Sequence, residues 1–273
     1  MATETSFQDK VVVVTGGGSG LGAAFCRRFS QAGARVAALD RQGQAARDLA
    51  AELKSKGAQA LGLECDVTDA AACRQAMQSV AQDWGGIDLL INNAGITHRS
   101  PFVETSLEVY RRVMEVNFFG ALNCTKAALD YLCQSRGFIL VISSVAGFAP
   151  LWERTGYSAS KHALHGFFDS LRGELEPLGV GVGLVCPSFA DTGIEKNALN
   201  GQGQPAQHPR STTGRVASAQ EVAQAVFKAA AARKRLSVLS PVGKASWWIS
   251  RICPGLYERL MLRRIRGRVP PLP

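Results

Sequence analysis

Tyr157 and Lys161 are the residues whose types and spacing point most directly to chemistry. They lie four positions apart in a segment of helical pattern, so both side chains can reach one ligand. A phenol can exchange a proton with an oxygen, but free tyrosine has a pKa near ~10. A lysine charge about 5 Å away, at an effective dielectric constant of about 20, lowers that pKa by about two units. The pair indicates acid/base chemistry near neutral pH, although two unrelated surface residues would show the same spacing.

A glycine-rich turn indicates where a phosphate-bearing ligand would bind. The segment Thr15–Gly22 directly follows an apolar run and precedes a helix predicted to begin at Ala23. Glycines let the backbone turn sharply and approach a pyrophosphate closely, and free N–H groups at a helix N-terminus attract its negative charge. The candidate cofactor-binding residues of this turn are Gly16, Ser19, Gly20, Leu21 and Gly22.

Asp40 is the residue that bears on the choice of cofactor. It stands twenty residues after Gly20, at the end of the second apolar run, where an acid would accept hydrogen bonds from the adenosine ribose. Its carboxylate would repel the extra phosphate of NADP, at about 4 kcal/mol per unit of charge at ~4 Å. Arg41 offers the alternative, because its guanidinium could bind that phosphate if Asp40 turned away. The residues favour NAD over NADP.

Apolar, β-branched runs alternate along the chain with amphipathic stretches of helical length. Runs that are apolar on both faces are typical of strands buried between two helix layers. The pattern predicts an α/β, Rossmann-like, doubly wound fold with a seven-stranded parallel sheet flanked by helices on both faces. The strands are expected at Val11–Val14, Arg35–Leu39, Ala60–Glu64, Leu89–Ile91, Phe138–Ile142, Gly181–Val185 and Leu236–Leu239.

Length and composition predict one globular domain with an extension. The chain has 273 residues, of which 46% are hydrophobic and 19% charged. We expect a single domain over residues 1–240, with a substrate loop at about 188–215 whose Gly/Gln/Pro/Ser/Thr-rich part, Asn197–Gly214, is mobile. Because neither a leading apolar segment nor a run of about 18 apolar residues occurs, a cytoplasmic protein is expected.

The cysteine and histidine patterns predict no metal site. Seven cysteines are scattered without a C-x-x-C pair, which indicates reduced thiols in the core. His162 and His165 stand near Lys161, but no carboxylate or cysteine partner has a spacing suited to a metal ion.

Several motifs occur in a fixed order, and together they resemble the short-chain dehydrogenase/reductase family. They are Thr15–Gly22 with G-x-x-x-G-x-G spacing, Asp66-Val67, Asn92-Asn93-Ala94-Gly95, Asn117, Ser144, Tyr157-Ser158-Ala159-Ser160-Lys161, and Pro187 with Thr192. The resemblance covers about residues 9–240. It implies an NAD(P)-dependent oxidoreductase acting on CH–OH donors, assembled as a homodimer or homotetramer. Ser188 departs from the glycine usual after this proline, which leaves the local turn in doubt.

The resemblance also implies roles for individual residues. Tyr157 would be the acid/base, with Lys161 beside it, and Ser144 would donate to the developing alkoxide; its choice over Ser143 rests on the family match. Asn117 would position a relay water, although a structural amide in a kinked helix fits equally well. Asp66 and Val67 would hold the adenine and Asn93 the adenosine side. Thr192 would bind the carboxamide, and Tyr157, Lys161 and Pro187 would complete the cofactor site.

Apolar residues flank the candidate catalytic set and suggest the substrate. An apolar wall with few polar anchors suits a small hydrophobic secondary alcohol or ketone, such as a steroid-like, retinoid-like or long-chain molecule. Core packing explains the same residues equally well. Arg154 could hold a carboxylate, but an exposed loop arginine is expected. The apolar residues are Phe148, Leu151, Trp152, Phe189, Ile194 and Leu199.

Residues 241–273 form a basic, amphipathic C-terminal extension. They hold seven Lys and Arg against Glu258, so they carry +6 of the net charge of +9. Trp247 and Trp248 are expected to be exposed. Three roles remain open: peripheral contact with an anionic membrane, a cover over the substrate or a second subunit, and a helix docked on its own domain. No reading motif supports nucleic-acid binding. One face of the predicted helix holds Tyr257, Leu260, Met261 and Ile265, and another holds Arg259, Arg263 and Arg266.

These residues predict hydride transfer between NAD(H) and a hydrophobic secondary alcohol or ketone. The alternatives are an NADP(H)-dependent carbonyl reductase and a non-catalytic protein that senses NAD(H). The intact set of Ser144, Tyr157 and Lys161 speaks against the sensor, because a sensor needs no proton donor there.

Overall fold

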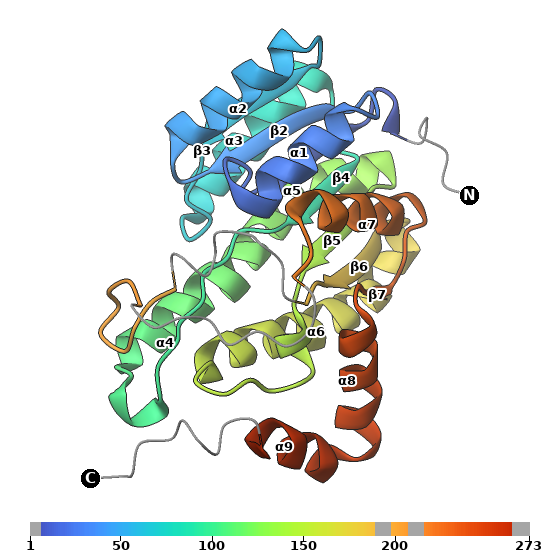
Figure 1. The fold of residues 1–273 in the computed structure, drawn as a ribbon. Coiled ribbons are helices and arrows are strands. Elements are labelled where there is room, and N and C mark those ends of the chain that lie inside the picture. Colours follow the sequence, from blue (N-terminus) through green and yellow to red (C-terminus); the bar gives the residue numbers. More distant parts are fainter. Residues whose placement is uncertain (1–6, 189–197, 207–215, 264–273) are drawn as a thin grey trace.

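One parallel sheet forms the centre of the molecule. The computed structural model describes residues 7–188, 198–206 and 216–263. Its seven strands pair in the order β3-β2-β1-β4-β5-β6-β7 (Figure 1). Each strand ends within one residue of its predicted bounds. The strands are β1 (Val11–Thr15), β2 (Arg35–Asp40), β3 (Ala60–Glu64), β4 (Leu89–Asn92), β5 (Phe138–Ile142), β6 (Gly181–Cys186) and β7 (Leu236–Val238).

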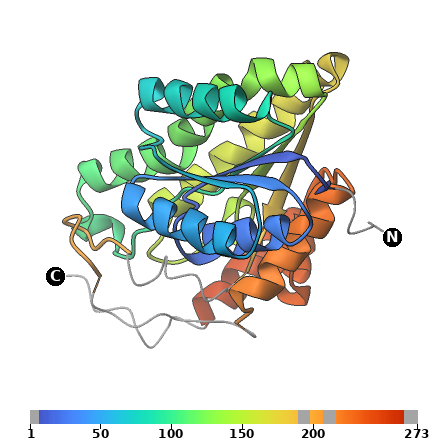
Figure 2. The ribbon, with the colours of Figure 1, turned by 90° about the horizontal axis from the view of Figure 1, so that it is seen from above.

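Helices cover both faces of the sheet, and Figure 2 shows the two layers with the sheet between them. α1 (Gly20–Ser30), α2 (Gly43–Ser55) and α7 (Ala219–Ala231) pack on one face. α3 (Ala70–Trp84), α5 (Gly120–Ser135) and α6 (Thr155–Leu175) pack on the other. Along β1, Val12 and Val14 enter the first core while Val11 and Val13 enter the second. This two-sided burial explains the unbroken apolar run, because each buried valine contributes roughly 1.5–3 kcal/mol.

The edge strands differ from the central ones. Most of β3 is only half-buried, with Glu64 exposed, and β7 is half-buried throughout. Burial on both faces was expected for every strand. A strand at the edge of the sheet, however, pairs with only one other strand, so its open side is left partly exposed. The prediction therefore holds for β1, β2, β4, β5 and β6 and is wrong for the two edges.

Two helices follow the sheet. α8 (Pro241–Ile252) begins where the Ser240 hydroxyl accepts a hydrogen bond from the Gly243 N–H at 2.8 Å. It ends at Cys253, which has non-helical dihedral angles, and α9 (Pro254–Arg263) begins immediately afterwards. Ile265 and Arg266, predicted to continue this helix, lie outside the described residues. Within the described ranges, no helix combines the length and the apolar character needed to span a membrane.

All seven cysteines are free thiols, but they are not all in the core. Cys26, Cys65, Cys73, Cys124 and Cys186 are buried, Cys133 is half-buried, and Cys253 is exposed. Cys253 corrects the prediction that all seven are core residues, because it occupies the link between two helices that project from the domain.

Candidate active site

The strand order reverses between β1 and β4, and the candidate cofactor turn lies at their carboxyl ends. A ligand crevice is expected at such a reversal. The Thr15 hydroxyl accepts hydrogen bonds from the N–H groups of Asn93 and Ala94, both at 3.0 Å. In return, Asn93 Nδ2 donates to the carbonyl oxygens of Thr15 at 2.9 Å and Gly16 at 3.2 Å. These bonds fix the start of the glycine turn against the segment after β4.

The glycine turn depends on two positions that exclude a side chain. Gly16 has a φ of +60°, and a Cβ there would lie 3.0 Å from the Ala94 Cα. A Cβ at Gly22 would collide with the carbonyl oxygen of Gly16. α1 begins at Gly20 and not at Ala23, so its N-terminus lies within the turn itself. Ser19, the N-cap of α1, makes no side-chain capping bond to a described residue. The first N–H groups of a helix are the donors that a phosphate could bind.

Asp40 sits at the end of β2 and faces the glycine turn. Its Oδ2 accepts a hydrogen bond from the Gly18 N–H at 3.0 Å, and its Oδ1 accepts one from the Gln42 N–H at 3.0 Å. The neighbouring Arg41 is exposed. The carboxylate is thus held beside the turn, as its proposed contact with an adenosine ribose requires.

The other predicted cofactor residues follow β3 and β6. The Asp66 carboxylate accepts hydrogen bonds from the N–H and the hydroxyl of Thr68, at 2.9 and 2.8 Å. Val67 is buried against Gly120. The Pro187 carbonyl accepts a hydrogen bond from the Val145 N–H at 3.2 Å. These segments lie at the carboxyl edge of the sheet, whereas Thr192 lies outside the described residues.

Asn117 is buried in a π-helical turn, η3 (Glu115–Phe119), between α4 (Leu107–Met114) and α5. Its Oδ1 accepts from the Ile96 N–H at 2.8 Å, and its Nδ2 donates to the Ile96 carbonyl at 2.9 Å. The same Nδ2 donates to Ser160 Oγ at 2.9 Å. The amide therefore ties the loop after β4 to α6. This is the structural role that the sequence left open, and a relay role remains compatible with it.

Lys161 links the end of β5 to the part of α6 that carries Tyr157. Its Nζ donates a hydrogen bond to the Ile142 carbonyl at 2.9 Å, which ties α6 to the end of β5. It lies 5.7 Å from the centre of the Tyr157 ring, one turn earlier on α6. Ser144, two residues after Ile142, starts the short helix η4 (Val145–Gly147), and its Oγ accepts from the Ala146 N–H at 3.1 Å. Two secondary-structure elements thus converge on one site.

Burial determines the electrostatic state of Lys161. The side chain is enclosed between α6 and β5, and desolvation lowers the pKa of its ammonium group to about 8, with a smaller opposing effect from Cys186. A buried cation that hydrogen-bonds only a neutral carbonyl is poised to interact with any negative charge that forms beside it. Tyr157, itself buried, is the nearby group that could carry such a charge.

A family model described as short chain dehydrogenase matches residues 10–203 of this chain. The chain belongs to the short-chain dehydrogenase/reductase family. Dehydrogenase/reductase SDR family member 7B of Bos taurus is 37% identical to it, covering 95% of this chain and 82% of the relative. Dehydrogenase/reductase SDR family protein 7-like of Drosophila melanogaster is 33% identical, covering 93% and 80%. A short-chain dehydrogenase/reductase from Burkholderia phymatum, solved in complex with NAD, superposes with a TM-score of 0.82 at 26% identity, covering 92% of this chain and 96% of that one.

Two residues stand within the motifs quoted from the sequence but were given no role of their own there. Thr15 closes the turn between β1 and β4, and Ser160 links Asn117 to the Tyr157 carbonyl, to which its hydroxyl donates at 2.8 Å. Thr15 had a signal, because it is a polar residue at the end of an apolar strand, directly before the glycines. Ser160 had none, because its partners come together only when α6 packs on the π turn.

Arg154 corrects an expectation. It precedes α6 and is only 9% exposed, although an exposed loop arginine was expected. Its Nη1 donates to Thr97 Oγ1 at 3.4 Å, and the Ser100 N–H donates to the Glu153 carbonyl at 3.1 Å. The segment after β4 therefore covers this loop, an arrangement that local sequence does not reveal.

Of the apolar residues predicted to line the substrate site, some are buried in the core and others are accessible. Phe148 is buried against Trp247 of α8, with ring centres 4.8 Å apart, so it serves packing. This contact also makes Trp247 half-buried, contrary to prediction, whereas Trp248 is exposed as expected. Trp152 is exposed and Leu151 half-buried. Within the substrate loop, residues 198–206 pair through Leu199 with His98, and Phe189 and Ile194 lie outside the described residues.

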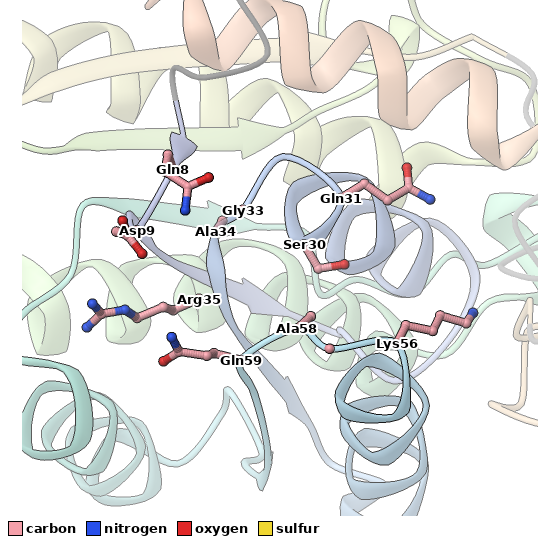
Figure 3. A pocket seen from close by; sticks show the side chains of 11 residues that line it. Gln8, Asp9, Ser30, Gln31, Gly33, Ala34, Arg35, Lys56, Ala58 and Gln59 are labelled. Atoms are coloured by element: carbon pink, nitrogen blue, oxygen red, sulfur yellow. The ribbon is translucent and has the colours of Figure 1, made fainter.

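A separate cavity of about 330 Å³ lies away from this site (Figure 3). Its lining comes from the start of β2 and from the turns before β1 and β3, at the amino edge of the sheet. Polar side chains such as Gln8, Arg35 and Gln59 surround it. Because the glycine turn and Tyr157 lie at the opposite edge, this cavity is not a continuation of the candidate active site.

Proposed function

We propose that this enzyme transfers a hydride between NAD(H) and a hydrophobic secondary alcohol or ketone, with Tyr157 as the acid/base. The observation that carries the proposal is the placement of the buried Lys161 ammonium 5.7 Å from the Tyr157 ring centre. A structural lysine would not need to be buried beside a phenol at the carboxyl edge of the sheet. Desolvation makes its position unfavourable unless the charge is used.

The residues at the strand reversal fit a dinucleotide. At Gly16 and Gly22 the backbone packs too closely for a Cβ, so the turn is tight and leads directly into the N-terminus of α1, where a pyrophosphate would bind. Asp40 presents its carboxylate at the end of β2, where a ribose would follow. Bound NAD would supply the hydride acceptor, and the protein would bind and orient it.

In alcohol oxidation, Tyr157 takes the hydroxyl proton as the hydride leaves the carbon; in ketone reduction, it returns that proton to the oxygen. The Lys161 charge favours the tyrosinate form in the first case. The Ser144 hydroxyl donates to the substrate oxygen and stabilises its developing charge. Asn117 holds α6 in place through Ser160, which keeps the Tyr157 oxygen aligned with the other donors.

The same residues support NAD over NADP. Asp40 is fixed by two backbone N–H groups, so turning it away to admit a phosphate would break two hydrogen bonds. The similar protein from Burkholderia phymatum was solved with NAD. Use of NADP(H) through Arg41 is the competing proposal.

We further propose that the substrate is apolar and that the enzyme forms a homodimer or homotetramer. Leu151 and Trp152 lie on the loop before α6, the helix that carries Tyr157, and offer an apolar surface there. Family membership supports the oligomer, which sedimentation velocity would test.

The deciding experiment is an assay of purified protein with steroids, retinols and long-chain alcohols and ketones, using both NAD(H) and NADP(H). Absorbance of the reduced nicotinamide reports turnover, and fluorescence reports cofactor binding. Turnover with NAD(H) supports the proposal. Tight cofactor binding without turnover on any substrate would instead support a non-catalytic sensor, and preference for NADPH would support the carbonyl reductase.

A further inference from the structure

Among the residues that the structure describes, most of the exposed large apolar side chains lie at one end of the molecule. Figure 1 draws α9, the segment leading into α4 and the loop before α6 at this end, away from α2 and α3. Such side chains are expected to scatter singly over a monomer, so their concentration at one end indicates an interaction surface. They are Phe102, Val103, Leu107, Trp152, Trp248, Ile252, Leu256 and Leu260.

The C-terminal apolar face, formed by Trp248, Ile252, Leu256 and Leu260, is the most regular part of this surface. Within each helix two members stand four residues apart, Trp248 with Ile252 on α8 and Leu256 with Leu260 on α9, and the break at Cys253 separates the two helices. Figure 1 draws the two helices at an angle to each other. The exposed fractions of the four side chains are 64%, 68%, 49% and 43%. A helix that only packs on its own domain would turn such side chains inward, so this face is built to contact something else.

Cations accompany the C-terminal apolar face. α8 and α9 carry Lys244, Arg251, Arg259 and Arg263 against Glu258, and none of these forms an ion pair with a described residue. The Arg251 guanidinium lies 3.5 Å from the centre of the Trp247 ring. Arginines and a tryptophan beside exposed aliphatic side chains are typical of helices that lie in the headgroup region of a membrane.

The face is attached to the loop that precedes the catalytic helix. Trp247 packs on Phe148, and the Tyr257 hydroxyl donates a hydrogen bond to the Pro150 carbonyl at 3.1 Å. Phe148 and Pro150 lie between Ser144 and Tyr157 in the chain. The surface and the catalytic residues therefore belong to the same end of the molecule.

We propose that the C-terminal apolar face docks on the surface of an anionic lipid bilayer. Trp248, Ile252, Leu256 and Leu260 enter the headgroup region, while Arg259 and Arg263 contact lipid phosphates. The protein lies on the bilayer without crossing it, and the loop before Tyr157 faces the membrane, where apolar molecules are concentrated.

The positive charge of α8 and α9 favours an anionic bilayer over a second copy of the chain as the partner of the C-terminal apolar face. A two-fold interface brings the same surface of both subunits together, so the cations of α8 and α9 would face one another. An anionic surface instead attracts each of them. The C-terminal apolar face is thus better matched to lipid than to itself.

The test is co-sedimentation of the full chain with two kinds of vesicle, one of phosphatidylcholine alone and one that also contains phosphatidylglycerol, each at low and high salt. We expect binding to the anionic vesicles that weakens with salt. Arg259→Glu with Arg263→Glu should lower the partition coefficient at least about 30-fold. The matched control, Lys54→Glu with Arg74→Glu, removes two exposed cations from α2 and α3 and should bind like wild type.

The apolar contribution needs its own pair of variants. Ile252→Ser should weaken binding about fivefold, because a well-exposed side chain loses its membrane contact. Leu178→Ser changes a similarly exposed side chain, after α6, and should have no effect. Circular dichroism confirms that every variant is folded.

Three results would overturn the proposal: no vesicle binding by wild type, equal binding to both kinds of vesicle, or equal losses in the test and control variants. Self-association that Ile252→Ser abolishes, without vesicle binding, would identify the face as a subunit interface instead. None of these measurements requires turnover, so they remain informative whether or not the proposed reaction is correct.

Discussion

The cofactor half and the reacting half of the site are built in different ways. At the glycine turn, shape comes from the backbone: Gly16 and Gly22 leave no room for a Cβ, and Asp40 is fixed by N–H groups. Around Tyr157, shape comes from buried side chains, where Asn117, Ser160 and Lys161 each bond a carbonyl of another segment or a neighbouring turn.

This difference determines which changes each half should tolerate. At the glycine turn, where the backbone forms the surface, adding a single Cβ is the disruptive change. Where side chains form it, removing one polar atom is disruptive, because a buried partner loses its hydrogen bond. The following predictions test that contrast, beginning with the largest effect.

Tyr157→Phe removes one oxygen from the reacting half. We expect kcat to fall by about 10²–10⁴-fold while NADH binding is retained, because the ring and its packing survive and the proton donor does not. Steady-state kinetics and NADH titration measure the two effects. Tyr131→Phe removes the same atom from a half-buried tyrosine of α5 and is the control. Substantial turnover by Tyr157→Phe would exclude the proposed role.

Lys161→Met removes the buried charge. Because the pKa of Lys161 falls from 10.5 to about 8 on folding, the unfolded chain binds more protons between these values, and stability rises with pH through that window. In the cofactor-free protein, the unfolding free energy of wild type should rise by about 3 kcal/mol relative to that of Lys161→Met as the pH increases from about 8 to 10.5.

Denaturant titrations of wild type and Lys161→Met from neutral to alkaline pH measure this difference. Lys126→Met, which removes an exposed ammonium from α5, serves as the control. A constant difference between wild type and Lys161→Met would show that the buried lysine is not desolvated as the structure indicates. Loss of NADH affinity in Lys161→Met is expected as well, since the ammonium would also bind the nicotinamide ribose.

Gly22→Ala tests the cofactor half. The new Cβ would collide with the Gly16 carbonyl, so we expect a loss of about 1–3 kcal/mol in unfolding free energy together with weaker NADH binding. Gly173→Ala is the matched control, because a Cβ there meets nothing within 4 Å. In a helix that substitution should stabilise by about 0.5–1 kcal/mol. A lower Tm for Gly22→Ala together with a higher Tm for Gly173→Ala would support the contrast. Shifts of Tm in the same direction would contradict it.

Asp40→Asn should have the smallest effect. Asn keeps one oxygen that can accept from the Gly18 N–H, but it loses the acceptor of the exposed Gln42 N–H and the charge that repels an additional phosphate. The preference for NAD over NADP in kcat/KM should therefore narrow by roughly tenfold, with the turn preserved. Asp40→Ala should narrow the preference too, while also weakening binding of both cofactors. A wild type that prefers NADPH would show that Arg41 dominates.

The sequence predicted what depends on local pattern. The strands were found because two-sided burial demands unbroken apolar runs, and the glycine turn was found because the bend at Gly16 and the close backbone packing at Gly22 demand glycine. The binding and catalytic roles of the predicted residues stay predictions. Their placement at one edge of the sheet nevertheless follows from the parallel order of the strands.

Features that depend on contacts between distant segments were missed. Arg154 is buried because the segment after β4 covers it, and Trp247 is half-buried because α8 packs on Phe148. Neither neighbour is adjacent in sequence. The start of α1 was placed three residues late, because glycines are poor helix formers and only the packed structure shows that Gly20 begins the helix.

The π turn at Asn117 has a consequence for heat-resistant variants. An α-helix that runs without an extra residue is the more regular structure, and single-turn π segments persist mainly where a site requires them. A variant that straightens the chain from α4 into α5 would rotate the Asn117 amide away from Ile96 and Ser160 and leave their buried polar groups without this partner. That loss offsets the gain in helical regularity, so a screen for heat resistance alone should retain the π turn.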